Sequence, residues 1–266
     1  MNASIVITAA IHFHKNKLYK ECMKKIAMIP ARYAATRFPY KLMQPLGNKT
    51  VIRHTYENTV ATQLFHAVYV VTDSEIIFNE IKVHGGNAIM SIKDHESGTD
   101  RIAEAVQNME ADIVLNVQGD EPFVKKNTLQ NLLLAFEDSK VEVASLMKKI
   151  NDPGLLANPN YVKLVCNKYN DAMLFSRSTI PFTRDDKIPF HFYEHIGVYA
   201  FRKNTLLRFT KWPLAPLEQI EKLEQLRYLY QGIPIRMVET MESSVKIDVP
   251  EDLVMAEAFL KRYKVA

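Results

Sequence analysis

The sequence predicts an α/β protein in which a mostly parallel central sheet is covered by helices on both faces. Short β-branched runs alternate with segments of helical spacing through the first half of the chain, which is the pattern of a parallel sheet. The 266 residues are enough for one large α/β domain. No internal repeat, low-complexity tract or linker divides residues 24–266, so we expect a single domain that carries an inserted region.

The elements of the first half follow from apolar spacing and from residues that start or stop a helix. The predicted strands are Lys24–Ile29, Ala67–Val71, Ala88–Ile92 and Ile113–Val117. The predicted helices are Thr50–Leu64, Glu75–His84 and Asp100–Met109, the last capped by Ser97 or Thr99. Parallel sheets bind ligands beyond the carboxyl ends of their strands. We therefore expect the chemistry in the loops after the first and the fourth strand.

The second half has a different pattern, with a hairpin and many prolines. Tyr161–Asn167 and Met173–Ser176 flank a polar turn and are predicted to pair. A helix at Pro216–Gln231, a strand at Ile233–Val238 and a final helix at Pro250–Tyr263 follow. The inserted, β-rich region is placed at about residues 151–215.

The first 22 residues are interpreted either as a wrongly assigned start of the sequence or as a loose extension. An apolar run at Ile5–Ile11 precedes Lys15, Lys17 and Lys20, whereas a secretory signal carries its positive charge before the apolar stretch. Met23 begins the pattern of the first strand and is our expected natural start.

Composition restricts the possible partners and the compartment. A net charge of +4 is mild and its lysines are dispersed, so we expect no nucleic-acid partner. No apolar run is long enough to span a membrane, so we expect no membrane partner. The two cysteines, Cys22 and Cys166, match no metal spacing and form no disulfide framework. A reducing compartment is the simpler interpretation, and we expect a cytoplasmic protein.

A basic loop follows the first strand and contains Arg32, Arg37 and Lys41. Arg grips phosphate oxygens in a bidentate way and Lys acts as a point charge, so the three cations can hold a triphosphate. There is no glycine-rich phosphate loop. Spacing alone favours the alternative, which is a solvated basic loop.

Two aspartates are candidates for a metal site. Asp120 follows the most strand-like run of the chain, and Asp248 directly precedes the last helix. Carboxylates there can bind Mg²⁺, which prefers oxygen ligands and substrate phosphates. The alternatives are a turn residue for Asp120 and a helix cap for Asp248.

Three further segments contain candidates for ligand contacts. The segment HESGTDR offers hydroxyl and backbone amide groups at a helix N-terminus, for ribose or phosphate, or else simply caps that helix. Arg177, in FSRSTIP, can pair with a sugar carboxylate. His195, in EHIG, can contact a sugar, although a lone histidine is more often structural.

These segments together resemble the 3-deoxy-manno-octulosonate cytidylyltransferases, the CMP-Kdo synthetases, from about Lys24 to Tyr263. The similar segments are IPARYAATRFPYK, HESGTDRIAE, NVQGDEP, NPNYVK, LFSRSTIPF, YEHIGVYAFR, PLEQIEKLEQLR and IDVPEDL, in the order of the family. IPAR alone occurs in other cytidylyltransferases, whereas the combination is specific.

The resemblance implies a three-layer, Rossmann-like nucleotidyltransferase fold and a homodimer formed partly by the inserted region. It also implies Mg²⁺ as cofactor, CTP and Kdo as substrates, and a role in lipopolysaccharide biosynthesis. It assigns residues to CTP, to the metal and to the sugar: Arg32, Arg37, Lys41, Ser97, Gly98 and Thr99 to CTP; Asp120 and Asp248 to the metal, with Lys41 also catalytic; and Gln118, Arg177, His195, Glu221 and Gln225 to the sugar.

Three positions depart from the family pattern. Tyr40 and Lys246 each stand where the family usually has glycine, and Ala35 stands where a small hydroxyl residue is common. Every charged candidate is still in place. The alternatives to Kdo transfer are a cytidylyltransferase for another acidic sugar, such as 8-amino-Kdo or a sialic acid, and a non-catalytic nucleotide-sugar binding protein.

Overall fold

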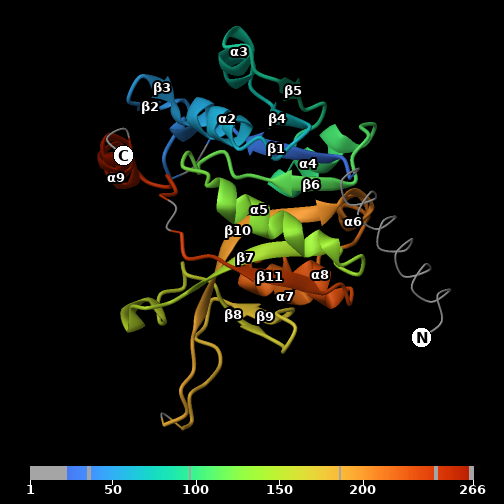
Figure 1. The fold of residues 1–266 in the computed structure, drawn as a ribbon, viewed down its shortest axis with the longest axis vertical. Coiled ribbons are helices and arrows are strands. Elements are labelled where there is room, and N and C mark those ends of the chain that lie inside the picture. Colours follow the sequence, from blue (N-terminus) through green and yellow to red (C-terminus); the bar gives the residue numbers. More distant parts are fainter. Residues whose placement is uncertain (1–22, 35–36, 96, 186, 243–244, 264–266) are drawn as a thin grey trace, which may run out of the picture.

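The computed structural model describes residues 23–263 apart from 35–36, 96, 186 and 243–244, so the proposed extension at residues 1–22 lies outside the described residues. Its main sheet has the strand order β11-β7-β10-β6-β1-β4-β5 (Figure 1). Neighbouring strands are parallel except at β10, which runs antiparallel to both β6 and β7. The prediction of a mostly parallel central sheet is therefore confirmed.

The bounds of the elements are as follows. The strands of the main sheet path are β1 (Lys25–Ala31), β4 (Ala67–Thr72), β5 (Ala88–Met90), β6 (Ile113–Asn116), β7 (Val143–Lys149), β10 (Tyr193–Arg202) and β11 (Ile235–Glu239). Two small hairpins are formed by β2 (Pro45–Leu46) with β3 (Lys49–Thr50) and by β8 (Lys163–Cys166) with β9 (Ala172–Ser176). The α-helices are α2 (Val51–Ala61), α3 (Glu75–Val83), α4 (Gly98–Val106), α5 (Lys126–Leu134), α6 (Lys203–Phe209), α7 (Pro216–Glu221), α8 (Leu226–Tyr230) and α9 (Pro250–Tyr263). Short 3₁₀ turns occur at Lys41–Met43, Ala135–Glu137 and Pro153–Leu155.

The sheet separates two apolar cores, as expected for a three-layer protein. Side chains of β1 alternate between them: Ala27 and Ile29 belong to one core, and Ile26 and Met28 to the other. Helices α2, α3, α5 and α9 contribute to the first core. Helices α4, α6 and α8 contribute to the second.

The predicted elements of the first half are all present, and their caps explain where the helices begin. Thr50 caps α2 by accepting from the backbone N–H of Arg53, and Ser97 caps α4 by accepting from that of Asp100. The sequence did not indicate β7, α5, β10 or α6. Of these, β10 matters most for function, because it lies between β6 and β7 in the middle of the sheet.

The single helix predicted at Pro216–Gln231 is wrong. The chain forms α7, leaves helical geometry at Lys222 with φ of 54°, and starts again as α8. The carbonyl groups released at the break are taken up by Arg177, whose Nε donates to Glu221 O (2.7 Å) and whose Nη2 donates to Lys222 O (3.4 Å). A contact with a residue distant in sequence therefore determines where the helix is interrupted. The local spacing of apolar residues does not indicate this interruption.

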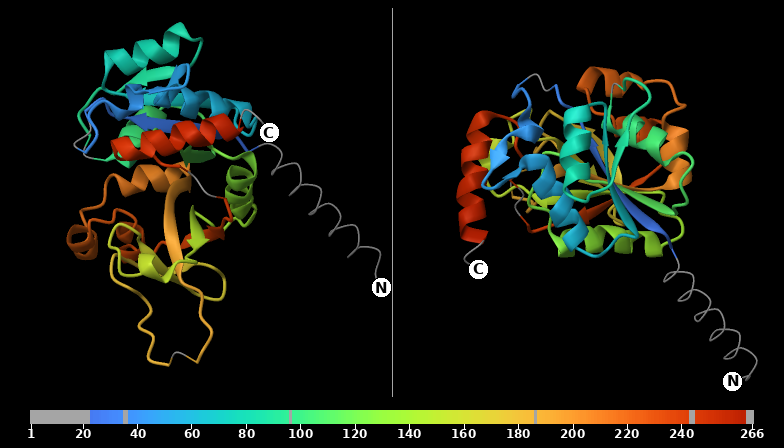
Figure 2. Two further views of the ribbon diagram at one scale, coloured as in Figure 1. Left: turned by 90° about the vertical axis from the view of Figure 1, so that its left-hand side faces the viewer. Right: turned by 90° about the horizontal axis from the view of Figure 1, so that it is seen from above.

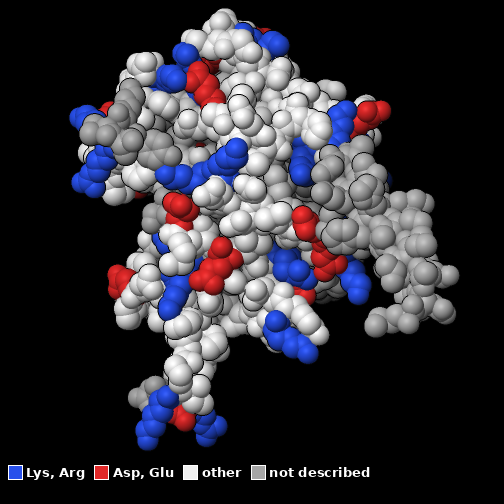
Figure 3. All heavy atoms as spheres, in the orientation of Figure 1, with Lys and Arg blue, Asp and Glu red and all other residues white. Residues whose placement is uncertain are grey.

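The β8–β9 hairpin and the loop between β9 and β10 extend away from the helical layers (Figures 1 and 2). This region belongs to the proposed insertion at residues 151–215, a range that also includes β10. On the face drawn in Figure 3, lysine and arginine lie beside aspartate and glutamate in several places. Within the described part of the chain, every helix is too short or too polar to cross a bilayer.

Candidate active site

A pocket of about 310 Å³ lies at the carboxyl ends of β1 and β6, where the sheet topology predicts a ligand. It is lined by Pro30, Arg32, Ala34, Lys41, Leu42, Gly98, Arg101, Gln118, Gly119 and Asp120. Gly119 is needed here, because a Cβ atom at this position would lie 3.0 Å from the carbonyl oxygen of Pro30. The turn that carries Asp120 can therefore approach the end of β1 closely.

Lys41 joins the two candidate metal ligands. Its Nζ donates to Asp120 Oδ2 (2.5 Å) and to Asp248 Oδ1 (2.8 Å). Arg37 adds a weaker ion pair, with Nη2 at 3.4 Å from Asp248 Oδ2. The backbone N–H of Ile247 donates to Asp120 O, which holds the segment before α9 against the turn after β6. Residues from three distant parts of the sequence therefore meet at one point.

The charges around Asp248 favour the ionised form of its carboxyl group. Burial acts to raise the pKa of Asp248, but the hydrogen bond from Lys41 and the charge of Lys246 prevail and hold the pKa at about 2. Asp248 is therefore fully charged at neutral pH.

The donor set fits a hard divalent cation. Asp120 Oδ1 is buried and has no hydrogen-bond partner among the described residues, which is costly unless a ligand takes it up. In the described part of the chain there is no cluster of three or more His, Cys, Asp or Glu side chains that could hold a metal. The protein would thus offer Asp120 and Asp248, and phosphate oxygens and water would complete the coordination, as Mg²⁺ sites commonly require.

The start of α4 forms one wall of the pocket. Gly98 lies against β1, since a Cβ there would be 3.1 Å from Pro30 Cγ. Ser97 is occupied as the helix cap, and Thr99 Oγ1 hydrogen-bonds to Glu224 Oε1. The backbone amides and the hydroxyl of Ser97 are thus placed beside the pocket, whereas Thr99 connects α4 to the turn between α7 and α8. Their assignment to CTP stays a prediction.

Gln118 connects this pocket to a second group of candidate residues. Its Nε2 donates to Gly197 O (3.2 Å), at the bulge that interrupts the pairing of β10 with β7. Two residues earlier, His195 Nε2 contacts Ser145 Oγ (2.9 Å) and His195 Nδ1 contacts Gln225 Nε2 (3.4 Å). Burial lowers the pKa of His195 to about 3, so the imidazole is neutral at physiological pH.

Arg177 and Glu221 lie together but are bound mainly to the protein itself. The Glu221 carboxylate accepts from Ser176 Oγ (2.6 Å) and from the backbone N–H of Arg177 (2.9 Å). The Arg177 guanidinium donates to backbone carbonyls, including Pro159 O (2.9 Å) and Glu221 O (2.7 Å). Since a guanidinium has five N–H donors, it retains capacity for a ligand carboxylate. The sugar-binding assignment of both residues stays a prediction.

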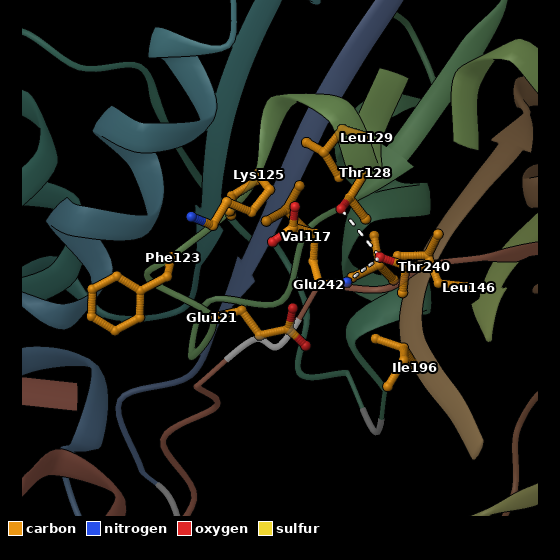
Figure 4. Close-up of a pocket in the computed structure, with 12 residues that line it drawn as sticks. Val117, Glu121, Phe123, Lys125, Thr128, Leu129, Leu146, Ile196, Thr240 and Glu242 are labelled. Carbon is orange, nitrogen blue, oxygen red and sulfur yellow. Dashed lines mark hydrogen bonds between the residues drawn. The ribbon is translucent and has the colours of Figure 1, made fainter. Parts of the chain in front are cut away.

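A smaller, largely apolar pocket lies under α5, beside the turn that carries Asp120 (Figure 4). Thr128 on α5 and Thr240 after β11 point toward each other across it, with their hydroxyl groups 3.4 Å apart. Glu121 also lines it, and burial together with the charge of Asp120 raises the pKa of Glu121 to about 7. Burial and the neighbouring carboxylate thus favour the protonated form of the residue that follows the candidate metal ligand.

Three residues of the site were not predicted as functional. Arg101 is almost fully buried and lines the main pocket, held by Asp73 Oδ2 (2.6 Å) and Ser91 Oγ (3.1 Å). Glu224 faces Thr99, and Lys246 contacts Asp248. Arg101 and Glu224 lie within HESGTDR and LEQLR, segments that the resemblance had already marked. Their partners are far away in sequence, so spacing gave no sign of their roles.

Comparisons with known proteins show which family the chain belongs to. The profile of the family described as cytidylyltransferase matches residues 26–243. A 3-deoxy-manno-octulosonate cytidylyltransferase of Flavobacterium johnsoniae is 55% identical over 242 residues, which cover 90% of this chain and 99% of the relative. The enzyme of the same name from Christiangramia forsetii is 52% identical, over 88% of this chain and 96% of the relative.

Solved structures support both the fold and the family. A CMP:2-keto-3-deoxy-manno-octonic acid synthetase complexed with CTP superimposes with a TM-score of 0.86 at 36% identity, covering 90% of this chain and 99% of that one. A 4-diphosphocytidyl-2C-methyl-D-erythritol synthase from Anaerococcus prevotii, at 16% identity and a TM-score of 0.62, shows the shared fold alone. The extent and identity of these matches place the chain in the 3-deoxy-manno-octulosonate cytidylyltransferase family.

Proposed function

We propose that the protein transfers the cytidylyl group of CTP to Kdo, giving CMP-Kdo and pyrophosphate for lipopolysaccharide biosynthesis. The observation that carries this proposal is the contact of Lys41 with both Asp120 and Asp248 at the mouth of the strand-end pocket. The name of the 55% identical relative supports Kdo as a substrate, and the complex of the 36% identical synthetase with CTP supports the nucleotide.

The reaction joins two anions, and the site is built to reduce their repulsion. The anomeric hydroxyl oxygen of the sugar attacks the α-phosphorus of CTP, the bond from the α-phosphorus to the bridging oxygen of the β-phosphate breaks, and pyrophosphate leaves. The proton of the hydroxyl group passes to water. Arg32, Arg37 and Lys41 supply positive charge on the triphosphate side, where negative charge moves onto the leaving group. Arg32 is held by its bond to His95 O (2.5 Å), so its direction is set before the nucleotide binds.

The cofactor proposed for this step is Mg²⁺, bound by Asp120 and Asp248. When bound, it supplies charge neutralisation and Lewis acidity at the transferred phosphoryl group. Lys41 keeps both carboxylates close together before the metal binds.

The sugar is proposed to lie between Gln118 and the group formed by His195, Gln225, Arg177 and Glu221. A neutral His195 can offer a hydrogen bond but no charge, so the sugar carboxylate is assigned to Arg177. The further partners and compartment that we propose are a second copy of the chain, in a homodimer, and the cytoplasm.

The test is pyrophosphate release from CTP with Mg²⁺, measured with Kdo and with N-acetylneuraminate in separate reactions. We expect release with Kdo only, and none after chelation of the metal. Release with N-acetylneuraminate would mean that the protein uses a different acidic sugar as its acceptor. No release with either sugar or with 8-amino-Kdo would favour a non-catalytic binding role.

The variant Asp120→Asn tests the proposed metal site in the same assay. It keeps the shape of the side chain but removes a charge, so we expect turnover to be lost while the protein stays folded by circular dichroism. A near-normal rate in this variant would contradict the assignment of Asp120.

A further inference from the structure

Lys246 places a second ammonium group on the two carboxylates that we assign to the metal. Its Nζ lies 3.2 Å from Asp248 Oδ2 and 4.0 Å from Asp120 Oδ2. Lys41 contacts Asp120 Oδ2 and Asp248 Oδ1, and Arg37 also reaches Asp248 Oδ2. Two negative charges are therefore opposed by three positive ones. Both oxygens of Asp248 are already in contact with a cation.

A divalent cation that uses both carboxylates must compete with these side chains. The two lysines differ in how firmly they are held. The Lys41 side chain is 16% exposed, whereas the Lys246 side chain is 48% exposed. Lysine is a point charge on a flexible stem, so an exposed lysine can change partner easily. Of the two lysines, Lys246 is thus the one that can leave Asp248 at the smaller cost.

The backbone of Lys246 is fixed although its side chain is exposed. The next residue, Ile247, is fully buried, and its N–H donates to Asp120 O (3.0 Å). The ammonium group can therefore move only within reach of its stem. Lys41, which lines the strand-end pocket, bonds the same two carboxylates, so that pocket is a near neighbour of the Lys246 ammonium.

We propose that Lys246 is a mobile counter-ion that occupies the metal site until the nucleotide arrives and then turns to its phosphates. The triphosphate offers more negative charge than the two carboxylates, so it draws the ammonium group away and opens Asp248 to the cation. Lys246 thereby makes metal binding and CTP binding interdependent. This inference rests on the proposed function for the identity of the two ligands.

The experiment compares Lys246→Met, Lys246→Gly and Lys246→Arg with the wild-type protein, without any sugar. Mn²⁺ is used as a probe, and its binding to the nucleotide-free protein is measured by electron paramagnetic resonance. We expect the Met and Gly variants to bind Mn²⁺ about tenfold more tightly, within the 5- to 150-fold range usual for coupled ligands. Lys246→Arg keeps the charge and should resemble the wild type.

A second measurement follows CTP alone, in the presence of a chelator, by calorimetry. We expect the Met and Gly variants to bind CTP more weakly than the wild type, since a phosphate contact is lost. The control is Lys82→Met, which removes the same charge from the exposed surface of α3 and should change neither affinity. Thermal melting verifies that all variants are folded.

Tighter Mn²⁺ binding together with weaker CTP binding in the Met and Gly variants supports the inference. Unchanged Mn²⁺ affinity, or unchanged CTP affinity, overturns it. Neither measurement needs turnover, so absence of cytidylyl transfer in the wild type would contradict the proposed function without deciding the role of Lys246.

Discussion

Tyr40 holds the backbone in a conformation that favours glycine, directly before Lys41. Its φ of 60° and ψ of 22° lie in the left-handed region, and its ring packs on Tyr33 with centroids 4.5 Å apart. The family pattern has glycine here, and the structure gives the physical reason. A bulky residue is tolerated at this position because the ring contact helps to hold the loop.

Replacing Tyr40 tests whether this backbone positions Lys41. The left-handed region costs any residue with a Cβ atom about 1–2 kcal/mol, and isoleucine adds the crowding of a branched Cβ and loses the ring contact with Tyr33. We expect Tyr40→Ile to shift Lys41 and to reduce kcat/KM for CTP by roughly tenfold, since 1.36 kcal/mol corresponds to a factor of ten. Tyr40→Gly, which adopts this conformation freely, should retain most activity. Steady-state kinetics of both variants give the answer, and equal losses would argue against a backbone effect.

The environment of His195 makes the stability of the protein depend on pH. Its pKa is lowered to about 3 by burial, so the unfolded chain binds a proton more readily than the folded protein does. The contribution of His195 to the free energy of unfolding is fully present above the ordinary histidine pKa of about 6.5. It declines as the pH falls toward 3.

The measurement is urea unfolding of the wild type and of His195→Gln between pH 7 and pH 4. We expect the variant to lose less stability over this interval, whatever its stability at pH 7. An identical dependence on pH in the two proteins would contradict the burial of a neutral imidazole.

At the scale of elements, α7 and α8 are connected by a buried ion pair. Arg227 donates from Nε to Glu218 Oε2 (2.8 Å) and from Nη2 to Glu218 Oε1 (2.5 Å), and both side chains are 8% exposed. The guanidinium also lies over the ring of Phe209, 4.1 Å from its centroid. Removal of one partner leaves the other charge buried.

We expect Glu218→Gln to destabilise the protein by about 3 kcal/mol, the lower end of the range for breaking a buried pair from one side. Thermal or chemical denaturation measures this loss. The matched control is Glu57→Gln, which removes a half-exposed carboxylate paired with Lys49 and Arg53 and should cost no more than about 1 kcal/mol. Equal effects would mean that burial does not set the strength of the pair.

The break between α7 and α8 is a feature that could not be predicted from the sequence. Residues 216–231 have uninterrupted helical spacing, and the break at Lys222 depends on Arg177, which lies 45 residues away from Lys222. The alternating elements of residues 24–117 were predictable because their caps and apolar periods are local. Strand β10 could not be predicted, because its polar residues and the bulge near Gly197 interrupt the alternation of apolar and polar residues that is typical of a strand.

The residues of the candidate site also divide into those that the local sequence indicates and those that only contacts between distant segments bring together. Arg32, Lys41 and Asp120 could be named as candidates because each follows a recognisable strand in the sequence, although spacing alone left the basic loop and the turn as open alternatives. The contact between Thr99 and Glu224 joins residues 125 apart, and the polar partners of His195 are Ser145 and Gln225. The spacing of these residues in the sequence does not indicate such pairs. The pairs form only when β10 and α8 have taken their positions in the folded protein.

For the whole molecule, the inserted region carries several of the exposed large apolar residues of the described chain. Large apolar side chains in residues 151–215 that are exposed are Tyr169, Met173, Leu174, Phe182, Ile188, Phe190 and Leu214. Such a group on a projecting hairpin and loop is typical of an association surface.

We therefore predict a dimer in solution, and predict that Phe182→Glu combined with Met173→Glu shifts it toward monomer. Phe182 is 86% exposed and Met173 is 64% exposed, so neither change disturbs the core. Sedimentation velocity over a range of protein concentrations measures the distribution. The exposed Val83→Glu on α3, at the far edge of the sheet, is the control, and a monomeric wild type at micromolar concentration would refute the prediction.

The order of strands in the sheet has a consequence for how the chain acquires its shape. Strands β1, β4, β5 and β6 follow one another in sequence except for the small β2–β3 hairpin, and they are neighbours in the sheet. A four-stranded unit spanning about the first half can thus nucleate from short loops, whereas β10 must close a much longer loop before it pairs with β6. Lys41 and Asp120 meet in the early unit, and Asp248 joins them last. Trp212, the one tryptophan of the sequence, lies in the late part against Phe209 and Tyr228, so its fluorescence follows the slower stage of refolding.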